Sequence, residues 1–112
     1  MTEKLSTRNP GPIAEKLLAR ESFKTNGELK GVAKPEWIDH GKMSVRDYGY
    51  LRSDRDFYGI DYVIYSYSTP IAWLRGDGSW FMPEAGYSTT TKRHKNTIRA
   101  AIQEYKKALN NA

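Results

Sequence analysis

Residues 61–67 read DYVIYSY, and five of these seven residues are β-branched or aromatic. Such side chains lose less conformational freedom in a pleated strand than in a helix. We therefore expect a central strand here, with both of its faces at least half buried. Eight of the fourteen aromatic residues of the chain lie between positions 57 and 81, so the core of the sheet is expected in the same region.

Turn residues divide the sequence that follows into further strands. Residues 68–70 read STP, and Pro70 has no N–H group to donate to a sheet ladder, so we expect a bend or a bulge there. Residues 71–75 and 79–82 are predicted to form two short strands. The glycines of the sequence GDG at 76–78 allow the positive φ angles that a tight hairpin between these strands requires.

Helical periodicity replaces strand alternation toward both ends of the chain. Between residues 91 and 110 the apolar side chains recur on one stripe at 100° per residue, which predicts an amphipathic helix packed on the sheet. Pro12 takes a permitted first-turn position in a shorter predicted helix at 12–20. The apolar stripe of the longer helix consists of Ile98, Ala101, Ile102, Tyr105, Ala108 and Leu109.

These elements define a fold class. Residues 28–33 are expected to form a first short strand, whereas residues 34–56 show no clear period and are interpreted as a long loop or insertion with room for a turn of helix. The predicted class is α+β: a small antiparallel sheet of three to four strands packed against a C-terminal amphipathic helix, with a short N-terminal helix. The 112 residues suffice for a single domain over 1–112, in which residues 1–10 are expected to be flexible.

The net charge of +5 is concentrated at the C-terminal end of the chain. Residues 1–88 contain twelve basic and twelve acidic side chains, so this block is neutral. Residues 89–112 contain six basic side chains and one acidic side chain, and six minus one accounts for the whole excess. A basic surface on a small domain is a candidate contact for nucleic acid or another polyanion.

The start of the predicted C-terminal helix breaks a local rule. Positive side chains are unfavourable in a first helical turn, where the helix dipole is already positive, yet the threonines at 89–91 are followed at once by basic residues. Hydroxyls, unpaired N–H groups and cations at one helix end suit a bound phosphate; the alternative is a threonine N-cap followed by solvated lysines. The candidate nucleic-acid or anion-binding residues are Thr90, Thr91, Lys92, Arg93, Lys95, Arg99 and Lys106.

Catalytic and metal chemistry find little support in the sequence. His94 lies on the apolar side of the predicted helix and is expected to be a hydrogen-bonded core residue; alternatively, it orients a group at the phosphate site. The chain has no cysteine and two histidines, so we expect no disulfide and no metal site. Without a phosphate loop or a nucleophile elbow, we also predict no enzymatic activity and no cofactor.

Aromatic residues of the sheet suggest a second class of function. A sheet face that no helix covers would present its aromatic side chains to a partner protein. The candidate partner surface consists of Tyr65, Tyr67, Trp73 and Trp80.

Part of the sequence resembles a known group of proteins. The runs YSYSTPIAW (65–73) and YSTTTKRH (87–94), with Trp80 and Pro83 between them, resemble a family of short uncharacterised proteins encoded by tailed phages and prophages. The run FKTNGELKGV (23–32) is similar to the opening strand of that family. The resemblance implies an origin and no activity: a phage accessory protein that acts in a bacterial cytoplasm.

Two functions follow as expectations. The first is non-catalytic binding of DNA or RNA through the basic C-terminal helix. The second is binding of a host bacterial protein, whose activity the phage factor inhibits or redirects through the aromatic sheet face. No apolar run approaches the roughly 18 residues of a membrane span, and the N-terminus carries no apolar signal segment, so we expect a cytoplasmic protein without membrane contact. The oligomeric state is left open.

Overall fold

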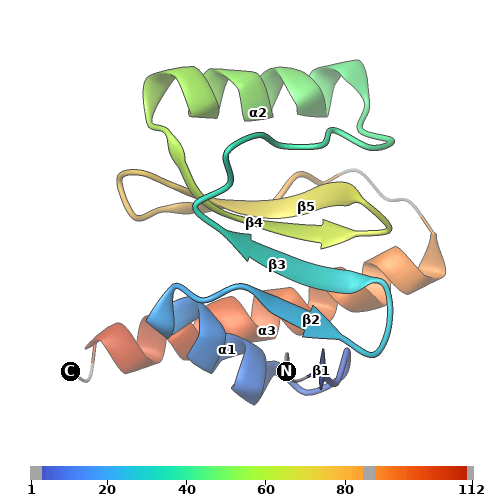
Figure 1. The fold of residues 1–112 in the computed structure, drawn as a ribbon, viewed down its shortest axis with the longest axis vertical. Helices are drawn as coiled ribbons and strands as arrows, with labels where there is room; N and C mark the ends of the chain where they lie inside the picture. Colours follow the sequence, from blue (N-terminus) through green and yellow to red (C-terminus); the bar gives the residue numbers. More distant parts are fainter. Residues whose placement is uncertain (1–3, 85–87, 111–112) are drawn as a thin grey trace.

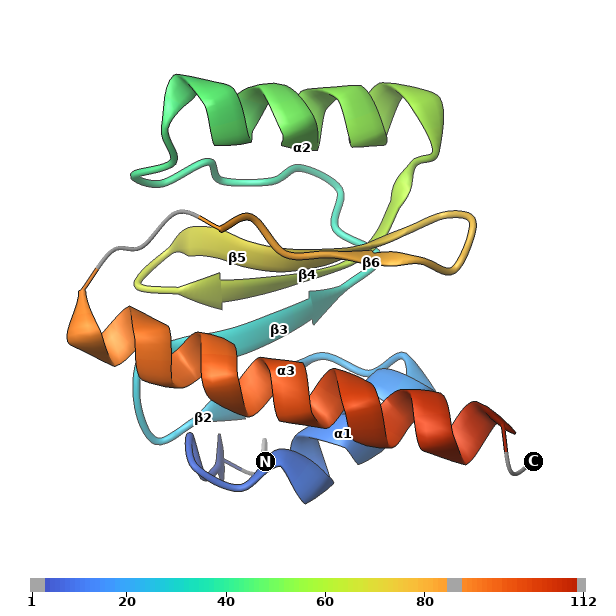
Figure 2. The same ribbon diagram turned by 180° about the vertical axis from the view of Figure 1, so that it is seen from behind.

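The computed structural model describes residues 4–84 and 88–110 of the chain. Within these residues the regular elements are, in chain order, β1 (Lys4–Leu5), α1 (Pro10–Ala19), β2 (Phe23–Thr25), β3 (Leu29–Ala33), α2 (Val45–Phe57), β4 (Ile60–Ser66), β5 (Thr69–Arg75), β6 (Trp80–Phe81) and α3 (Thr89–Asn110). The six strands form one sheet in the order β1-β2-β3-β4-β5-β6. Helices α1 and α3 lie together on one side of this sheet and α2 lies on the other (Figures 1 and 2).

The α+β class is confirmed, but the predicted number of strands is too low. β1 has two residues and β2 has three, which is too short for strand alternation to be visible in the sequence. β1 lies within the first ten residues, for which the sequence analysis expects flexibility; it pairs in parallel with β2 and buries Leu5 in the core. Every other pair of neighbouring strands is antiparallel. Residues 1–3 lie outside the described residues.

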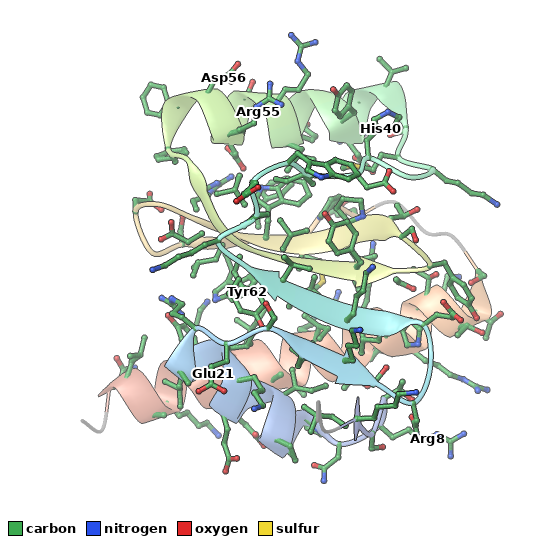
Figure 3. All side chains as sticks on the ribbon, viewed as in Figure 1. Arg8, Glu21, His40, Arg55, Asp56 and Tyr62 are labelled. Atoms are coloured by element: carbon green, nitrogen blue, oxygen red, sulfur yellow. The ribbon has the colours of Figure 1, made fainter. Side chains whose placement is uncertain are left out.

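β4 and β5 form the central hairpin, and both of its faces are buried as predicted. Tyr62 and Ile64 pack into the apolar cluster beneath α1 and α3, whereas Val63 and Tyr65 pack with Leu51 of α2. The Tyr62 hydroxyl donates a hydrogen bond to the carbonyl oxygen of Glu21, beside α1 (Figure 3). Burial raises the pKa of the Tyr62 phenol far above its ordinary value.

The turn of this hairpin is tight and unusual in composition. Ser66 pairs with Thr69, so the turn consists of Tyr67 and Ser68, which both have a left-handed backbone (φ 52° and 65°). This conformation costs an L-residue other than glycine roughly 1–2 kcal/mol. The predicted bulge is confirmed next to the turn, because the register shifts between the pairs made by Ile64 and Tyr65.

α3 carries the predicted apolar stripe over most of its length. Ile98, Ala101, Ile102 and Tyr105 are buried in the larger apolar cluster. The last two predicted stripe positions, Ala108 and Leu109, are wrong, because both side chains are exposed. The physical reason is length: α3 spans about 33 Å, whereas its neighbour α1 spans about 15 Å and leaves the last turn uncovered. Among the described residues, no helix has the length and hydropathy needed to cross a membrane.

The interpretation of residues 34–56 as a loop or insertion is wrong for its second half, where α2 forms. The Ser44 hydroxyl caps α2 by accepting a hydrogen bond from the N–H of Asp47 (3.1 Å). The side chains that α2 buries are Asp47, Leu51 and Asp54, which share one face of the helix. Because two of these three residues are acidic, the buried face shows no apolar period in the sequence.

Asp54 is buried because it has two hydrogen-bonding partners on β5. One of its carboxylate oxygens accepts hydrogen bonds from Trp73 Nε1 and from Arg75 Nε, each at 2.8 Å. Arg75 and Asp54 thus form an ion pair that ties α2 to the sheet.

Replacing Asp54 tests this attachment. Asp54→Ala leaves the buried Trp73 N–H and the Nε–H of Arg75 without their acceptor, so we expect the free energy of unfolding to fall by about 3 kcal/mol. Urea denaturation measures the loss. The matched control is Asp56→Ala, which removes an exposed carboxylate of the same helix and should leave stability unchanged; equal effects of the two substitutions would contradict the account.

Candidate nucleic-acid interface

Ser88 caps the N-terminus of α3. Its hydroxyl accepts a hydrogen bond from the N–H of Thr91 (3.1 Å), and its carbonyl oxygen accepts one from the N–H of Lys92 (3.0 Å). The helix therefore begins two residues earlier than predicted, and its cap is a serine rather than one of the threonines. The remaining N–H groups of the first turn have no partner within the helix.

A chain of buried polar groups connects this cap to the central hairpin. The Thr91 hydroxyl lies 3.2 Å from the Ser88 hydroxyl and 3.1 Å from the Ser66 hydroxyl, which in turn lies 2.7 Å from Nδ1 of His94. Thr91 and His94 are each 4% exposed, and Ser66 is 2% exposed. The Thr91 hydroxyl, one of the predicted anion ligands, is therefore used inside the protein.

His94 is the hydrogen-bonded core residue that the sequence analysis favours. Burial lowers the pKa of its imidazole, against a smaller opposing effect of the Glu28 carboxylate, so the ring is neutral at pH 7. The Ser66–His94 contact has the distance of a nucleophile–base pair, but Ser66 is buried and no carboxylate among the described residues hydrogen-bonds to His94. We assign this contact a structural role.

Lys95 is a second predicted ligand that the fold uses internally. Its ammonium group donates a hydrogen bond to the carbonyl oxygen of Pro83 (2.7 Å), and the residue is 6% exposed. Burial lowers the pKa of Lys95, while the Asp47 carboxylate of α2 acts in the opposite direction. Lys95 thus joins α3 to the segment after β6 instead of lining the exposed edge of the helix.

The remaining predicted cations are exposed on α3 but do not form one cluster. Lys92 and Arg99 lie beside Pro83, and the Arg99 guanidinium donates a hydrogen bond to the side-chain oxygen of Asn96 (3.0 Å). Lys106 lies two turns further along the helix. Arg93 instead faces the end of the sheet that carries the β2–β3 and β4–β5 turns.

An open groove of about 640 Å³ lies at this end, and we call it the α3 groove. The segment that follows β1 forms one wall, because the Thr97 hydroxyl donates a hydrogen bond to the carbonyl oxygen of Thr7 (2.9 Å). Arg8 therefore lies at the same end of the molecule as the start of α3 (Figure 3). The lining residues are Thr7, Arg8, Gly27, Glu28, Tyr67, Thr90, Arg93, His94, Asn96 and Thr97.

Arg8 is a groove residue that was not predicted, and Tyr67 lies in the groove instead of on the predicted aromatic surface. Arg8 is separated from Arg93 by most of the chain, and no local pattern marks it. Tyr67 is 51% exposed at the rim because it occupies the left-handed turn of the central hairpin. A turn of Tyr and Ser gives no sequence signal, since glycine and asparagine are the usual residues at such positions.

The aromatic partner surface predicted for the sheet is not present as one surface. Tyr65 and Trp73 are buried beneath α2, while Trp80 is half-buried on the opposite face, where its ring packs edge-on to Tyr105 (6.3 Å between centroids). Tyr67 is the exposed member of the predicted set. The predicted surface is absent because α2 covers the sheet face that carries Tyr65 and Trp73. The polar sequence of α2 does not indicate this helix.

Comparison with protein families identifies the chain. Residues 17–111 match a family described as a family of unknown function, DUF8033. The chain belongs to this family. The match includes Tyr67, Thr90 and Arg93 of the α3 groove and does not reach Arg8. No curated protein and no solved structure matches the chain.

The lowered pKa of His94 predicts a particular dependence of stability on pH. The unfolded chain binds a proton at His94 near its ordinary pKa of 6.5, whereas the folded protein resists protonation. Stability is therefore complete above this pH and should be lost as the pH falls below it. We expect urea denaturation at pH 7.5 and 5.5 to show a smaller loss for His94→Gln, which retains a hydrogen-bonding group and does not titrate. Parallel losses in both proteins would contradict the assignment.

Proposed function

We propose that this protein is a small, non-catalytic accessory protein that binds nucleic acid at the α3 groove, and that its ligand is single-stranded. The observation that carries the proposal is the meeting of two arginines and an exposed tyrosine in one groove. Arg8, after β1, and Arg93, on α3, both line the groove and are exposed, and Tyr67 lines it too with an exposed side chain. These groups come from three distant parts of the sequence.

The charge of the groove favours a phosphate backbone. Arg8 and Arg93 contribute two positive charges and Glu28 contributes one negative charge, so the net charge of the groove is two minus one, or +1. His94 adds no charge, because it is neutral at pH 7. The free N–H groups and the dipole at the start of α3 add partial positive charge on the same side. Arginine also suits this role chemically, because its planar guanidinium group binds two phosphate oxygens at once.

Tyr67 favours a single strand over a duplex. Its ring is half exposed beside the arginines, and an exposed aromatic ring can stack on an unpaired base. Bases within a duplex are already stacked and are not accessible to such a ring. No base-reading motif accompanies the groove, so we expect DNA and RNA to be bound with low sequence specificity.

The biological setting is part of the same proposal. The resemblance of residues 65–73 and 87–94 to short proteins of tailed phages and prophages supports an origin in a phage. A single-strand-binding accessory protein of this kind would act in the cytoplasm of the infected bacterium.

Neutralising the two arginines tests the groove. We expect Arg8→Ala with Arg93→Ala to reduce the affinity for a 20-nucleotide oligothymidylate at least tenfold in 50 mM salt. Fluorescence anisotropy at several salt concentrations should also show that the slope of log affinity against log salt becomes shallower by about 1.4, because two phosphate contacts are lost. Lys107→Ala, at the other end of α3, is the control. The same slope in the double variant and the control would rule out the groove.

Substituting Tyr67 separates stacking from charge. Asparagine tolerates a left-handed backbone better than tyrosine, so Tyr67→Asn should keep or raise the melting temperature. Its affinity for oligothymidylate should fall by about 1–3 kcal/mol with an unchanged salt slope, since the ring and no charge is removed. Tyr67→Phe retains the ring and should bind like the wild type. Equal affinities of the Asn and Phe variants would contradict a stacking role.

A further inference from the structure

Three lysines lie side by side across the first three strands of the sheet. Lys4 of β1 pairs directly with Lys24 of β2, and Lys24 pairs directly with Lys30 of β3. Directly paired residues of neighbouring strands project from the same face of a sheet, with Cβ atoms about 5 Å apart. We call these three residues the lysine row.

The lysine row is exposed on the face of the sheet opposite to α1 and α3. Phe23 and Leu29, which alternate with the lysines along β2 and β3, are buried in the cluster beneath those two helices, whereas all three lysines are exposed. On the side of the row, α2 lies over β4 and β5, and no helix among the described residues covers β2 and β3 (Figure 1). Lys30 marks the boundary, because its ammonium group lies 5.4 Å from the centre of the Tyr65 ring.

This arrangement is unfavourable for the protein alone. Like charges placed directly opposite each other destabilise a sheet. The ion pairs of the described residues involve Lys16, Arg55 and Arg75, so no carboxylate pairs with the lysine row. Lysine on an edge strand discourages aggregation, but that purpose would be served by Lys4 alone, since Lys30 is two strands away from the edge.

We propose that the lysine row is a second contact surface for the phosphates of the single-stranded nucleic acid bound in the α3 groove. The inference rests on the proposed function and extends it. One hairpin connects the two surfaces: its strands carry Lys24 and Lys30, and its turn contributes Gly27 and Glu28 to the groove. A nucleic-acid strand that leaves the groove and passes around this turn reaches the lysine row on the opposite face of the sheet.

The geometry of the two surfaces also favours a single-stranded ligand over a duplex. The protein is about 30 Å across, so a strand that contacts both faces has to bend sharply within that length. Duplex DNA is stiff over about 150 base pairs, whereas a single strand bends freely. Lys24 is three residues and Lys30 two residues from the groove residues Gly27 and Glu28, so at 3.3 Å per strand residue the path around the turn is about 10 Å, the length of about three nucleotides at 3.4 Å each. A 20-nucleotide strand can therefore occupy both surfaces, whereas a dinucleotide, which is shorter than this path, cannot.

The charge reversal Lys24→Glu tests the proposal with opposite effects on binding and stability. It places a carboxylate between Lys4 and Lys30, so we expect a melting temperature a few degrees higher. Affinity for a 20-nucleotide oligothymidylate in 50 mM salt should fall about tenfold, while affinity for a thymidine dinucleotide, which is too short to reach both surfaces, stays within twofold of the wild type. Lys107→Glu makes the same charge change on α3 and should alter either affinity by less than twofold.

The outcomes separate this inference from the proposed function. Unchanged binding by Lys24→Glu, with weaker binding by the Arg8 and Arg93 double variant, overturns the lysine row and retains the groove. Absence of binding by the wild type overturns both. Equal losses for Lys24→Glu and Lys107→Glu also overturn the row, because net charge alone would then explain them. The lysine row would also be overturned if Lys24→Glu bound the strand as the wild type does but self-associated. That result would indicate that the lysines serve to prevent aggregation.

A measurement on the unmodified protein avoids any effect of substitution on folding. Acetylation of lysine amines, quantified by mass spectrometry, should be slowed at Lys4, Lys24 and Lys30 by the 20-nucleotide strand and not at Lys107. Equal acetylation of the row with and without the strand would overturn the proposal.

Discussion

The burial of the β4–β5 hairpin on both faces is the constraint on which the rest of the structure depends. Tyr62 and Trp73 are fully buried on opposite sides of it, and each side needs a covering layer. α1 and α3 supply one layer. α2 supplies the other, together with the segment that precedes it, and the Asp54 carboxylate holds α2 to Trp73 and Arg75. The position of α3, and therefore of its N-terminus, follows from this arrangement.

Elements with apolar periodicity, and β6, which follows a clear glycine turn, could be predicted from the sequence, whereas the polar α2 and the short β1 and β2 could not. The run at 61–67 and the stripe around Ile98 and Tyr105 indicate a strand and a helix because their buried positions are apolar. α2 buries two aspartates, and the partners of one of them, Asp54, lie on β5, so the buried face of α2 becomes recognisable only when Trp73 and Arg75 are brought beside it. β1 and β2 are too short to show a pattern.

The candidate site was predicted in part for the same physical reason. The sequence located the start of α3, and Thr90 and Arg93 do lie in the groove. It could not show that Thr91 and Lys95 turn inward, because their partners, Ser66 and Pro83, belong to other elements. Arg8 enters the groove through the bond between Thr97 and Thr7, and such a long-range contact has no signature in the local sequence.

Residues that are unfavourable for the fold gather around the β2–β3 hairpin: the left-handed Tyr67, Arg93 near the start of α3, and the paired lysines. The central claim is that they form a surface for single-stranded nucleic acid, and residue-resolved NMR tests it most directly. Titrating the isotope-labelled protein with a 20-nucleotide oligothymidylate should shift the amide signals of Arg8, Tyr67, Thr90 and Arg93 and leave those of α2 unchanged. Shifts confined to α2, or no shifts in 50 mM salt, would contradict the claim.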